Sequence, residues 1–159
     1  MGFLQDLISR GQKAAKAYAG DATFLMGAAA AAAIVTRADG QVDEGEITAA
    51  LEGLTANPLL KTFPASKIED VFTQALDRAK SRAGKIELQR SIAALAIRSL
   101  EERQDVFLIG ADVADSDGIG AEERKVLDEI AKTLGLDAAK LLGEPVSYTH
   151  LTLPTTPYV

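Results

Sequence analysis

Six consecutive alanines, Ala28 to Ala33, lie inside an apolar stretch that runs from Ala22 to Val35. Alanine has the highest helix propensity, and its small side chain lets neighbouring helices approach closely. The stretch is interrupted by Thr23 and Gly27, and it is shorter than the roughly 20 apolar residues that span a bilayer. We therefore predict a helix over residues 22–37 that is buried at the centre of a helical protein.

The rest of the chain supports an all-helical fold. Aromatic residues make up only 5% of the 159 residues and there is no tryptophan, so Ala, Leu, Ile and Val must build the core. Apolar residues recur at helical spacing and no segment shows sustained strand-like alternation. We predict an all-α fold, a single seven- to eight-helix bundle with pseudo-two-fold related halves. The expected helices cover residues 2–18, 22–37, 44–55, 66–83, 86–100 and 102–115, then a helix that ends at Leu134 and a short turn over 137–142.

Several residues predict where these helices begin and end. Asp21 and Asp43 are candidate N-caps, and Glu46 follows Asp43 at the spacing of a capping box. Ser66 is expected to cap the helix over 66–83, and Gly84 to separate that helix from the next.

Two scarce residue types restrict the chemistry. The chain has no cysteine and a single histidine, which excludes thiolate metal sites, disulfides, a Ser-His-Asp triad and multi-histidine metal sites within one chain. Any bound metal must therefore be held by oxygen, as calcium, magnesium and manganese are. We expect no catalysis. Carboxylate pairs occur in the sequence, but nothing in it supplies a tuned base, a nucleophile or an oxyanion hole.

The net charge is −6, which disfavours nucleic-acid binding and attachment to an anionic membrane. Residues 1–20 contain charged side chains and no uninterrupted apolar segment of the secretory type. A cytoplasmic location, with no direct insertion into a membrane, is the expectation that remains.

Two Asp-Gly pairs occur in matching contexts. Asp39-Gly40 and Asp117-Gly118 each follow an apolar helix and precede an acidic first turn of an amphipathic helix. The glycine permits a positive-φ turn, which can wrap oxygen atoms around one point. Carboxylates about 4 Å apart repel by about 1 kcal/mol in water, so crowded acids either splay into solvent or share a cation. The loops are therefore candidate binding sites for a divalent cation.

Helix capping is the competing interpretation of the same acids, since the helix dipole favours carboxylates in a first turn by about 0.3–1 kcal/mol each. The EF-hand alternative fails. Aligning Gly40 or Gly118 to the invariant glycine of that loop puts Val35 or Val113 at the first ligand position. Neither loop then has a full set of ligands.

The chain resembles the TerB family of tellurite-resistance proteins. The first signature is Ala38-Asp39-Gly40 followed by Asp43-Glu44 and Glu46, and the second is Asp115-Ser116-Asp117-Gly118 with Glu122-Glu123 and the segment from Glu129 to Asp137. The resemblance covers residues 1 to about 143, with similar spacing between the signatures. Gly120-Ala121 departs from the pattern, where an acidic or hydroxyl residue is typical, so the second loop matches the family signature less fully than the first.

This resemblance implies a function. It implies a non-catalytic part in tellurite resistance and stress response, as an adaptor or regulator that works with other Ter-system proteins, including a membrane-bound component that recruits it to the inner face of the membrane. It implies a divalent cation, calcium first and magnesium or manganese otherwise. The ligand candidates that it carries over are Asp39, Asp43, Glu46, Asp117, Glu122 and Glu123. A helical protein-interaction module whose acidic loops only cap helices is the alternative.

The C-terminal residues differ from the body. Residues 145–159 contain three of the five prolines and no Asp, Glu, Lys or Arg. We predict a helical domain over residues 1–143 and a non-native or disordered tail over 144–159. Deleting the tail should leave the melting temperature unchanged, and a clear loss would contradict the assignment.

Overall fold

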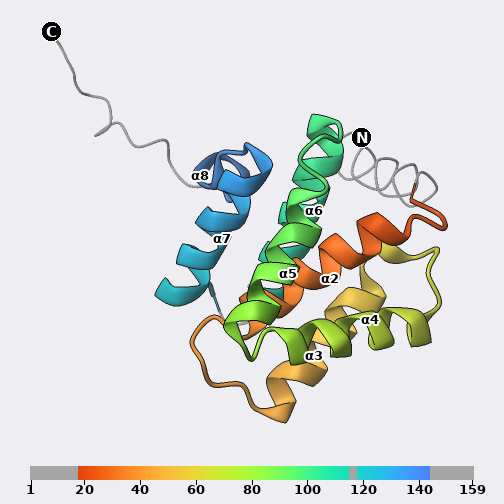
Figure 1. Cartoon of the computed structure of the whole chain (residues 1–159), viewed down its shortest axis with the longest axis vertical. Coiled ribbons are helices and arrows are strands. Elements are labelled where there is room, and N and C mark those ends of the chain that lie inside the picture. Colours follow the sequence, from red (N-terminus) through yellow and green to blue (C-terminus); the bar gives the residue numbers. More distant parts are fainter. Residues whose placement is uncertain (1–17, 115–117, 144–159) are drawn as a thin grey trace, which may run out of the picture.

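The computed structural model describes residues 18–114 and 118–143. The described residues contain seven α-helices and one short 3₁₀ helix and no strand, so the predicted all-α class is confirmed (Figure 1). The elements are α2 (Ala22–Thr36), α3 (Glu44–Ala56), η1 (Pro58–Leu60), α4 (Ala65–Arg78), α5 (Arg82–Ala93), α6 (Leu100–Ala114), α7 (Ala121–Leu134) and α8 (Ala138–Leu141).

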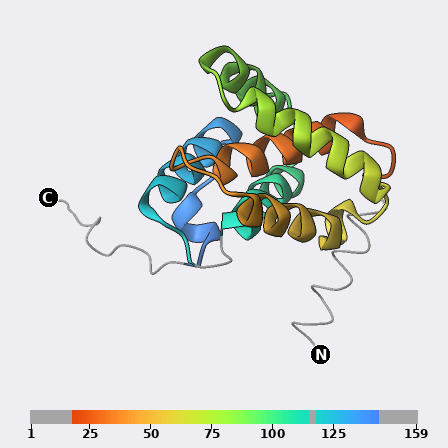
Figure 2. The ribbon, with the colours of Figure 1, turned by 90° about the horizontal axis from the view of Figure 1, so that it is seen from below.

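Helix α2 runs through the middle of the bundle, as the alanine run predicts. It packs against α3, α4, α5, α6 and α7, and Figures 1 and 2 show it crossed by helices on several sides. Ala28 to Ala33 are all buried. A Cβ added to Gly110 of α6 would lie 3.4 Å from the Cβ of Ala31, so the two backbones already approach closely. Small residues at this crossing allow that approach.

Two predicted N-caps are confirmed. Asp21 Oδ1 accepts the Phe24 amide at 3.0 Å. Asp43 and Glu46 form the full capping box at the start of α3, since each side chain accepts from the backbone amide of the other residue. The third prediction is wrong: α4 starts one residue earlier, with Pro64 in the cap position and no side-chain cap hydrogen bond. The fixed φ of proline suits an extended residue that leads into a helix.

The predicted break at Gly84 is also wrong. Helix α4 ends at Arg78, and α5 begins at Arg82 with Ser81 as its cap, because Ser81 Oγ accepts the Gly84 amide at 3.0 Å. Gly84 is buried inside α5. A Cβ there would collide with the Arg78 carbonyl group, so glycine serves close packing of the α4–α5 turn and does not end a helix.

The helix predicted over 86–100 stops at Ala93, and residues 94–97 form turns. Leu95 is buried, and it fills the space beside Gly27 of α2 where a side chain would otherwise lie. Ser99 Oγ then accepts the Glu102 amide at 3.2 Å, which starts α6. The predicted helix was too long because Leu95 continues the helical spacing of apolar residues, although it packs inward from a turn.

Three predictions are not tested by the described residues. The helix over 2–18 and the tail over 144–159 lie outside the described residues, apart from Tyr18, and the relation between the two halves stays a prediction. Within the described ranges, none of the helices has the length and apolar character needed to cross a bilayer.

Candidate functional site

The two acidic loops border the same cleft. It has a volume of about 840 Å³ and lies between the end of α2, the start of α3, the end of α6 and the start of α7. Six acidic residues line it: Asp39, Asp43, Glu46, Asp112, Glu122 and Glu123. No lysine or arginine is among the described residues around it. The fold therefore brings together five of the six predicted ligand candidates, and the sixth, Asp117, lies outside the described residues.

In the first loop, the carboxylates are held by local hydrogen bonds. Gly40 has a φ of 82°, the left-handed conformation that the Asp-Gly pair predicted. Asp39 Oδ1 accepts the Gln41 amide at 3.0 Å. Asp43 Oδ1 accepts the Glu46 amide at 2.7 Å, and Glu46 Oε1 accepts the Asp43 amide at 3.1 Å. Each of these bonds uses one oxygen of a carboxylate that has two. Capping therefore leaves each carboxylate with a second oxygen that could coordinate a cation.

The second loop repeats part of this geometry. Gly118 has a φ of 86°, close to that of Gly40. Glu123 Oε1 accepts the Gly120 amide at 2.9 Å, as Glu46 does for Asp43 in the first loop. Gly120 has no side chain to return the bond, so the second box is only half formed. The matching turn conformations and matching glutamates are what the repeated sequence predicted.

Asp112 was not among the predicted ligands, although it lines the cleft. It lies on α6, just before the second loop, and its side chain is exposed. Only the packing of the end of α6 beside α3 places it there. The single sequence signal was its membership of the acidic run before Asp117.

Small side chains form much of the remaining cleft wall. Gly45, Ala49 and Gly53 follow each other at four-residue spacing on α3 and line the cleft, and Ala121 does so at the start of α7. Positions four apart share one helix face, so beyond Glu46 in its first turn the wall that α3 contributes is built from small residues. The acids therefore stand around an open space and not around a packed one.

The donor chemistry fits a hard cation, but the described geometry is not that of a closed metal site. All six side chains offer carboxylate oxygens, which calcium and magnesium prefer. Five of the six are exposed and Glu123 is half-buried. Within residues 18–114 and 118–143, no three acidic or histidine side chains converge as a metal-binding group. The cleft therefore collects negative charge from both halves without a preformed coordination shell.

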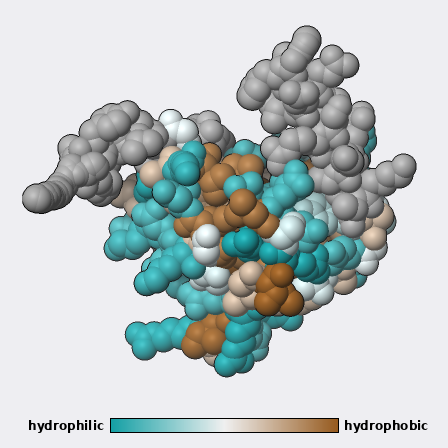
Figure 3. Space-filling view, turned by 90° about the horizontal axis from the view of Figure 1, so that it is seen from above, coloured by the Kyte–Doolittle hydropathy of each residue, from teal (hydrophilic) through white to brown (hydrophobic). Residues whose placement is uncertain are grey.

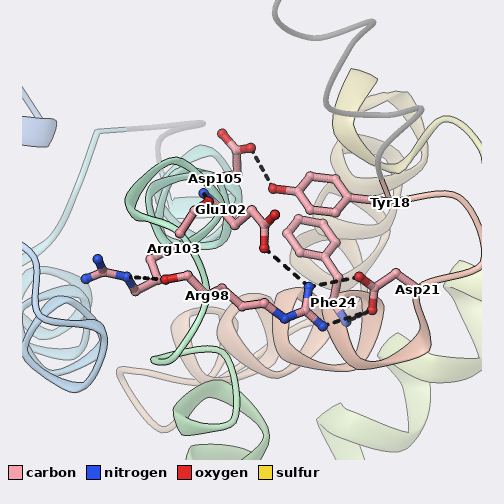
Figure 4. Close-up of polar contacts among 8 residues, drawn as sticks. Tyr18, Asp21, Phe24, Arg98, Glu102, Arg103 and Asp105 are labelled. Carbon is pink, nitrogen blue, oxygen red and sulfur yellow. Dashed lines mark hydrogen bonds and ion pairs between the residues drawn. The ribbon is translucent and has the colours of Figure 1, made fainter.

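A second polar cluster lies at the other end of α2 (Figure 4). Arg98 donates to Asp21 Oδ2 at 2.9 Å and lies 3.4 Å from Glu102 Oε1. The hydrogen bond from Arg98 is the main reason that the pKa of Asp21 is lowered, and burial opposes that shift. The pKa of Arg98 is correspondingly raised, chiefly by its hydrogen bond to Asp21. The pair joins the start of α2 to the segment before α6.

Arg103 extends this cluster towards α7. Its Nε donates to the Arg98 carbonyl at 3.0 Å, and its NH1 donates to the Leu134 carbonyl at 2.7 Å. The last carbonyls of a helix lack intrahelical partners, so the arginine satisfies one of them at the end of α7. Sequence reasoning did not find this cluster, because no spacing relates residues so far apart in the chain. Its role in the structure is to tie helix ends together.

The fold and the cleft define an all-helical protein with acidic loops from two parts of the chain around one opening. The model of one family, described as tellurite resistance protein TerB, matches residues 25–142. The match covers well over half of the chain, so this protein belongs to the TerB family, as the resemblance predicted. Comparison with the curated proteins and with the solved structures gives no match.

Proposed function

We propose that this TerB-family protein is a non-catalytic component of a tellurite-resistance and stress-response system, and that it binds a divalent cation in the acidic cleft. The observation that carries the proposal is the meeting of both acidic loops at one cleft that has no lysine or arginine among its described lining residues. Carboxylates that face one cleft repel each other, and a doubly charged ion between them reduces that repulsion.

Calcium is the first candidate, with magnesium or manganese as alternatives. Calcium accepts six to eight oxygen ligands in flexible geometry and keeps waters where protein ligands are few. Exposed carboxylates that stand around a roomy cleft suit such an ion better than magnesium, which demands a tight octahedron. The residues that would hold it are Asp39, Asp43, Glu46, Asp112, Glu122 and Glu123, with Asp117 as the remaining candidate from the sequence.

Regulation through partners is the mode of action that this chemistry favours. The chain has no cysteine, so it holds no thiol that could reduce or capture tellurite. A cation that draws the two loops together would instead change the surface that a partner meets. We place the protein in the cytoplasm, acting with other Ter-system proteins and recruited to the inner face of the membrane by a membrane-bound one.

A second candidate function has its own support. The reciprocal capping box of Asp43 and Glu46, and the bond from Gly120 to Glu123, give three of the acids a purely structural task. On that basis the protein is a helical interaction module and the acids only start helices. The two candidates differ in what the cleft does when cation is added.

Titration of the full chain with calcium, followed by calorimetry and by amide NMR signals, separates the two. We expect the amides of Gly45, Asp112 and Gly120 to shift along one common binding curve, because both loops face one cleft. Magnesium and manganese are titrated in the same way. No heat and no shifts at millimolar calcium would reject cation binding and leave the interaction module.

Matched variants assign the response to the cleft. Asp112→Asn removes one charge from the cleft wall and should weaken calcium binding. Asp70→Asn removes one exposed charge from α4, away from the cleft, and should leave the affinity unchanged. Equal effects of the two variants would show that only the net charge matters.

A further inference from the structure

The exposed surface of the protein offers few groups that react without an enzyme. On the face that Figure 3 shows, hydrophilic and apolar surface alternate. Exposed amines and aliphatic side chains are inert in water, and the chain has no cysteine. An aspartate before a glycine is an exception, because glycine has no side chain to hinder attack of its nitrogen on the neighbouring carboxyl group. Of the two such pairs in the sequence, Asp39-Gly40 lies within the described residues and Asp117-Gly118 does so only in part.

Asp39 differs from the other described aspartates in its surroundings. Each of the others lies in a helix or caps one, where backbone hydrogen bonds hold the following peptide bond in place. Asp39 lies in the loop between α2 and α3, and both Asp39 and Gly40 are exposed. No atom lies within 4 Å of the position that a Cβ of residue 40 would take. Water and the Asp39 side chain therefore have free access to the Gly40 backbone.

A local hydrogen bond holds the Asp39 carboxyl group beside the peptide bond that follows it. Asp39 Oδ1 accepts the Gln41 amide at 3.0 Å. A side chain that bonds two residues on folds back over the intervening peptide bond, which here contains the Gly40 nitrogen. The Gly40 amide donates to the Arg37 carbonyl at 3.0 Å, and that bond must open before the nitrogen reacts. Because it lies in an exposed turn, it opens without unfolding a helix.

We propose that Asp39-Gly40 is a spontaneous modification site, at which Asp39 isomerises to isoaspartate in the folded chain. The Gly40 nitrogen bonds to the side-chain carbon of the protonated Asp39 carboxyl group, loses its proton and expels water, which closes a succinimide ring. Water then adds to either carbonyl carbon of the ring. Opening at the side-chain carbon restores aspartate. Opening at the main-chain carbon leaves the chain linked through the former side chain, which is isoaspartate.

The isomerisation changes the wall of the acidic cleft, because Asp39 lines it. Isoaspartate has one additional main-chain carbon and carries its carboxylate directly on Cα, so the carboxylate reaches less far. The bond from Gln41 to the side chain is lost with it, whereas the net charge stays the same. The chemistry requires no bound cation, so the proposal is independent of cation binding in the cleft.

Incubation of the full chain at neutral pH in water enriched in heavy oxygen tests the proposal. Each passage through the ring places one oxygen from water in residue 39, whether the product is aspartate or isoaspartate. Trypsin then releases Asp39 on the peptide 38–61 and Asp117 on the peptide 104–124, so the two pairs are measured separately. Fragmentation in a mass spectrometer locates the label and the isomer. We expect both at Asp39 and neither at Asp43, which caps α3 within the same peptide.

A free peptide of residues 36–44 sets the duration, because the incubation continues until that peptide has taken up label. Absence of label from Asp39 of the full chain at that time would overturn the proposal, and so would equal labelling of Asp43. Asp39→Glu keeps the charge but has to close a larger ring, which forms far more slowly. It should therefore abolish the label at this position, and label that persisted would contradict the ring mechanism.

A destabilised variant shows whether the folded chain reacts. Tyr18→Phe removes a hydrogen bond at the other end of α2 and leaves the loop unchanged. The labelling rate at Asp39 should equal that of the original chain. A rate that rose in this variant would assign the reaction to the unfolded chain and overturn the proposal.

Discussion

The Tyr18 hydroxyl donates a 2.8 Å hydrogen bond to Asp105 Oδ2, although the two residues are 87 positions apart. Asp105 is only 5% exposed, and it is the one charged side chain buried among the described residues. The Tyr18 ring stacks on Phe24 with 3.5 Å between ring centroids (Figure 4). Burial is the main reason that the pKa of Tyr18 is raised, and the nearby Asp105 charge adds to it. The phenol therefore stays a donor, and it ties the start of the described chain to α6.

Tyr18→Phe should reduce the free energy of unfolding by about 1–3 kcal/mol, because it withdraws a donor from a buried carboxylate while keeping the ring. Urea denaturation measures the change. Asp105→Ala alone should also destabilise, since it leaves the buried phenol without its acceptor. The double variant should lose less than the sum of the two single losses, because each change removes the same bond. Strict additivity would show that the bond contributes nothing.

The Arg98–Asp21 pair should make stability depend on acid pH. The pKa of Asp21 is lowered in the folded protein, first by the hydrogen bond from Arg98. A lowered carboxyl pKa stabilises the fold above the unfolded value of about 3.9, and that contribution is lost as the pH falls through the folded pKa. Arg98→Gln should therefore cost about 1 kcal/mol at pH 7 and progressively less below about pH 4.

Asp21 also caps α2, so its variants must separate the cap from the charge. Asparagine caps as well as aspartate does, whereas alanine does not cap. Asp21→Asn should therefore match Arg98→Gln in unfolding experiments at pH 7, and Asp21→Ala should lose about 1 kcal/mol more. If the penalty of Arg98→Gln were as large at pH 3 as at pH 7, the pH dependence would not come from this pair.

The sequence predicted helices best where residues close together in the chain determine the local structure. The alanine run required a buried helix whatever surrounds it, and Asp43 with Glu46 form a capping box within four residues. The errors at Ser66 and Gly84 have a different origin. Helix α4 begins one residue earlier than predicted, after Pro64, and Gly84 is needed because the Arg78 carbonyl group at the end of α4 lies against it. That approach depends on how the chain turns between α4 and α5, which apolar spacing alone does not reveal.

For the candidate site too, the sequence predicted the local features but not those that depend on how the helices pack. The glycines of the two loops adopt the left-handed conformation that the Asp-Gly pairs predicted. That both loops border one cleft, with Asp112 on its wall, depends on how α3, α6 and α7 pack. The Tyr18–Asp105 and Arg98–Asp21 contacts join residues 87 and 77 positions apart, and no local pattern marks them.

Two glycine substitutions should have opposite effects. Gly84→Ala places a Cβ against the Arg78 carbonyl group, which is backbone and cannot rotate away, so it should destabilise by about 1–3 kcal/mol. Gly53→Ala meets no atom within 4 Å and lies in the exposed part of α3. It should stabilise by about 0.5–1 kcal/mol, because alanine is the better helix former. Thermal unfolding measures the stability change in both variants. A stabilising Gly84→Ala would contradict the described α4–α5 turn.

Two substitutions of Asp43 distinguish helix capping from cation binding. Asp43→Asn keeps a side chain that caps α3 but removes a charge from the cleft, so the free energy of unfolding without cation should change by less than about 0.5 kcal/mol. Asp43→Ala removes both the cap and the charge, and it should cost about 1 kcal/mol. If a cation binds the cleft, both variants should weaken calcium affinity alike in calorimetry, although only one of them weakens the fold. If the acids serve only as caps, Asp43→Asn should behave as the unchanged protein does in both measurements, because asparagine replaces aspartate in that task alone.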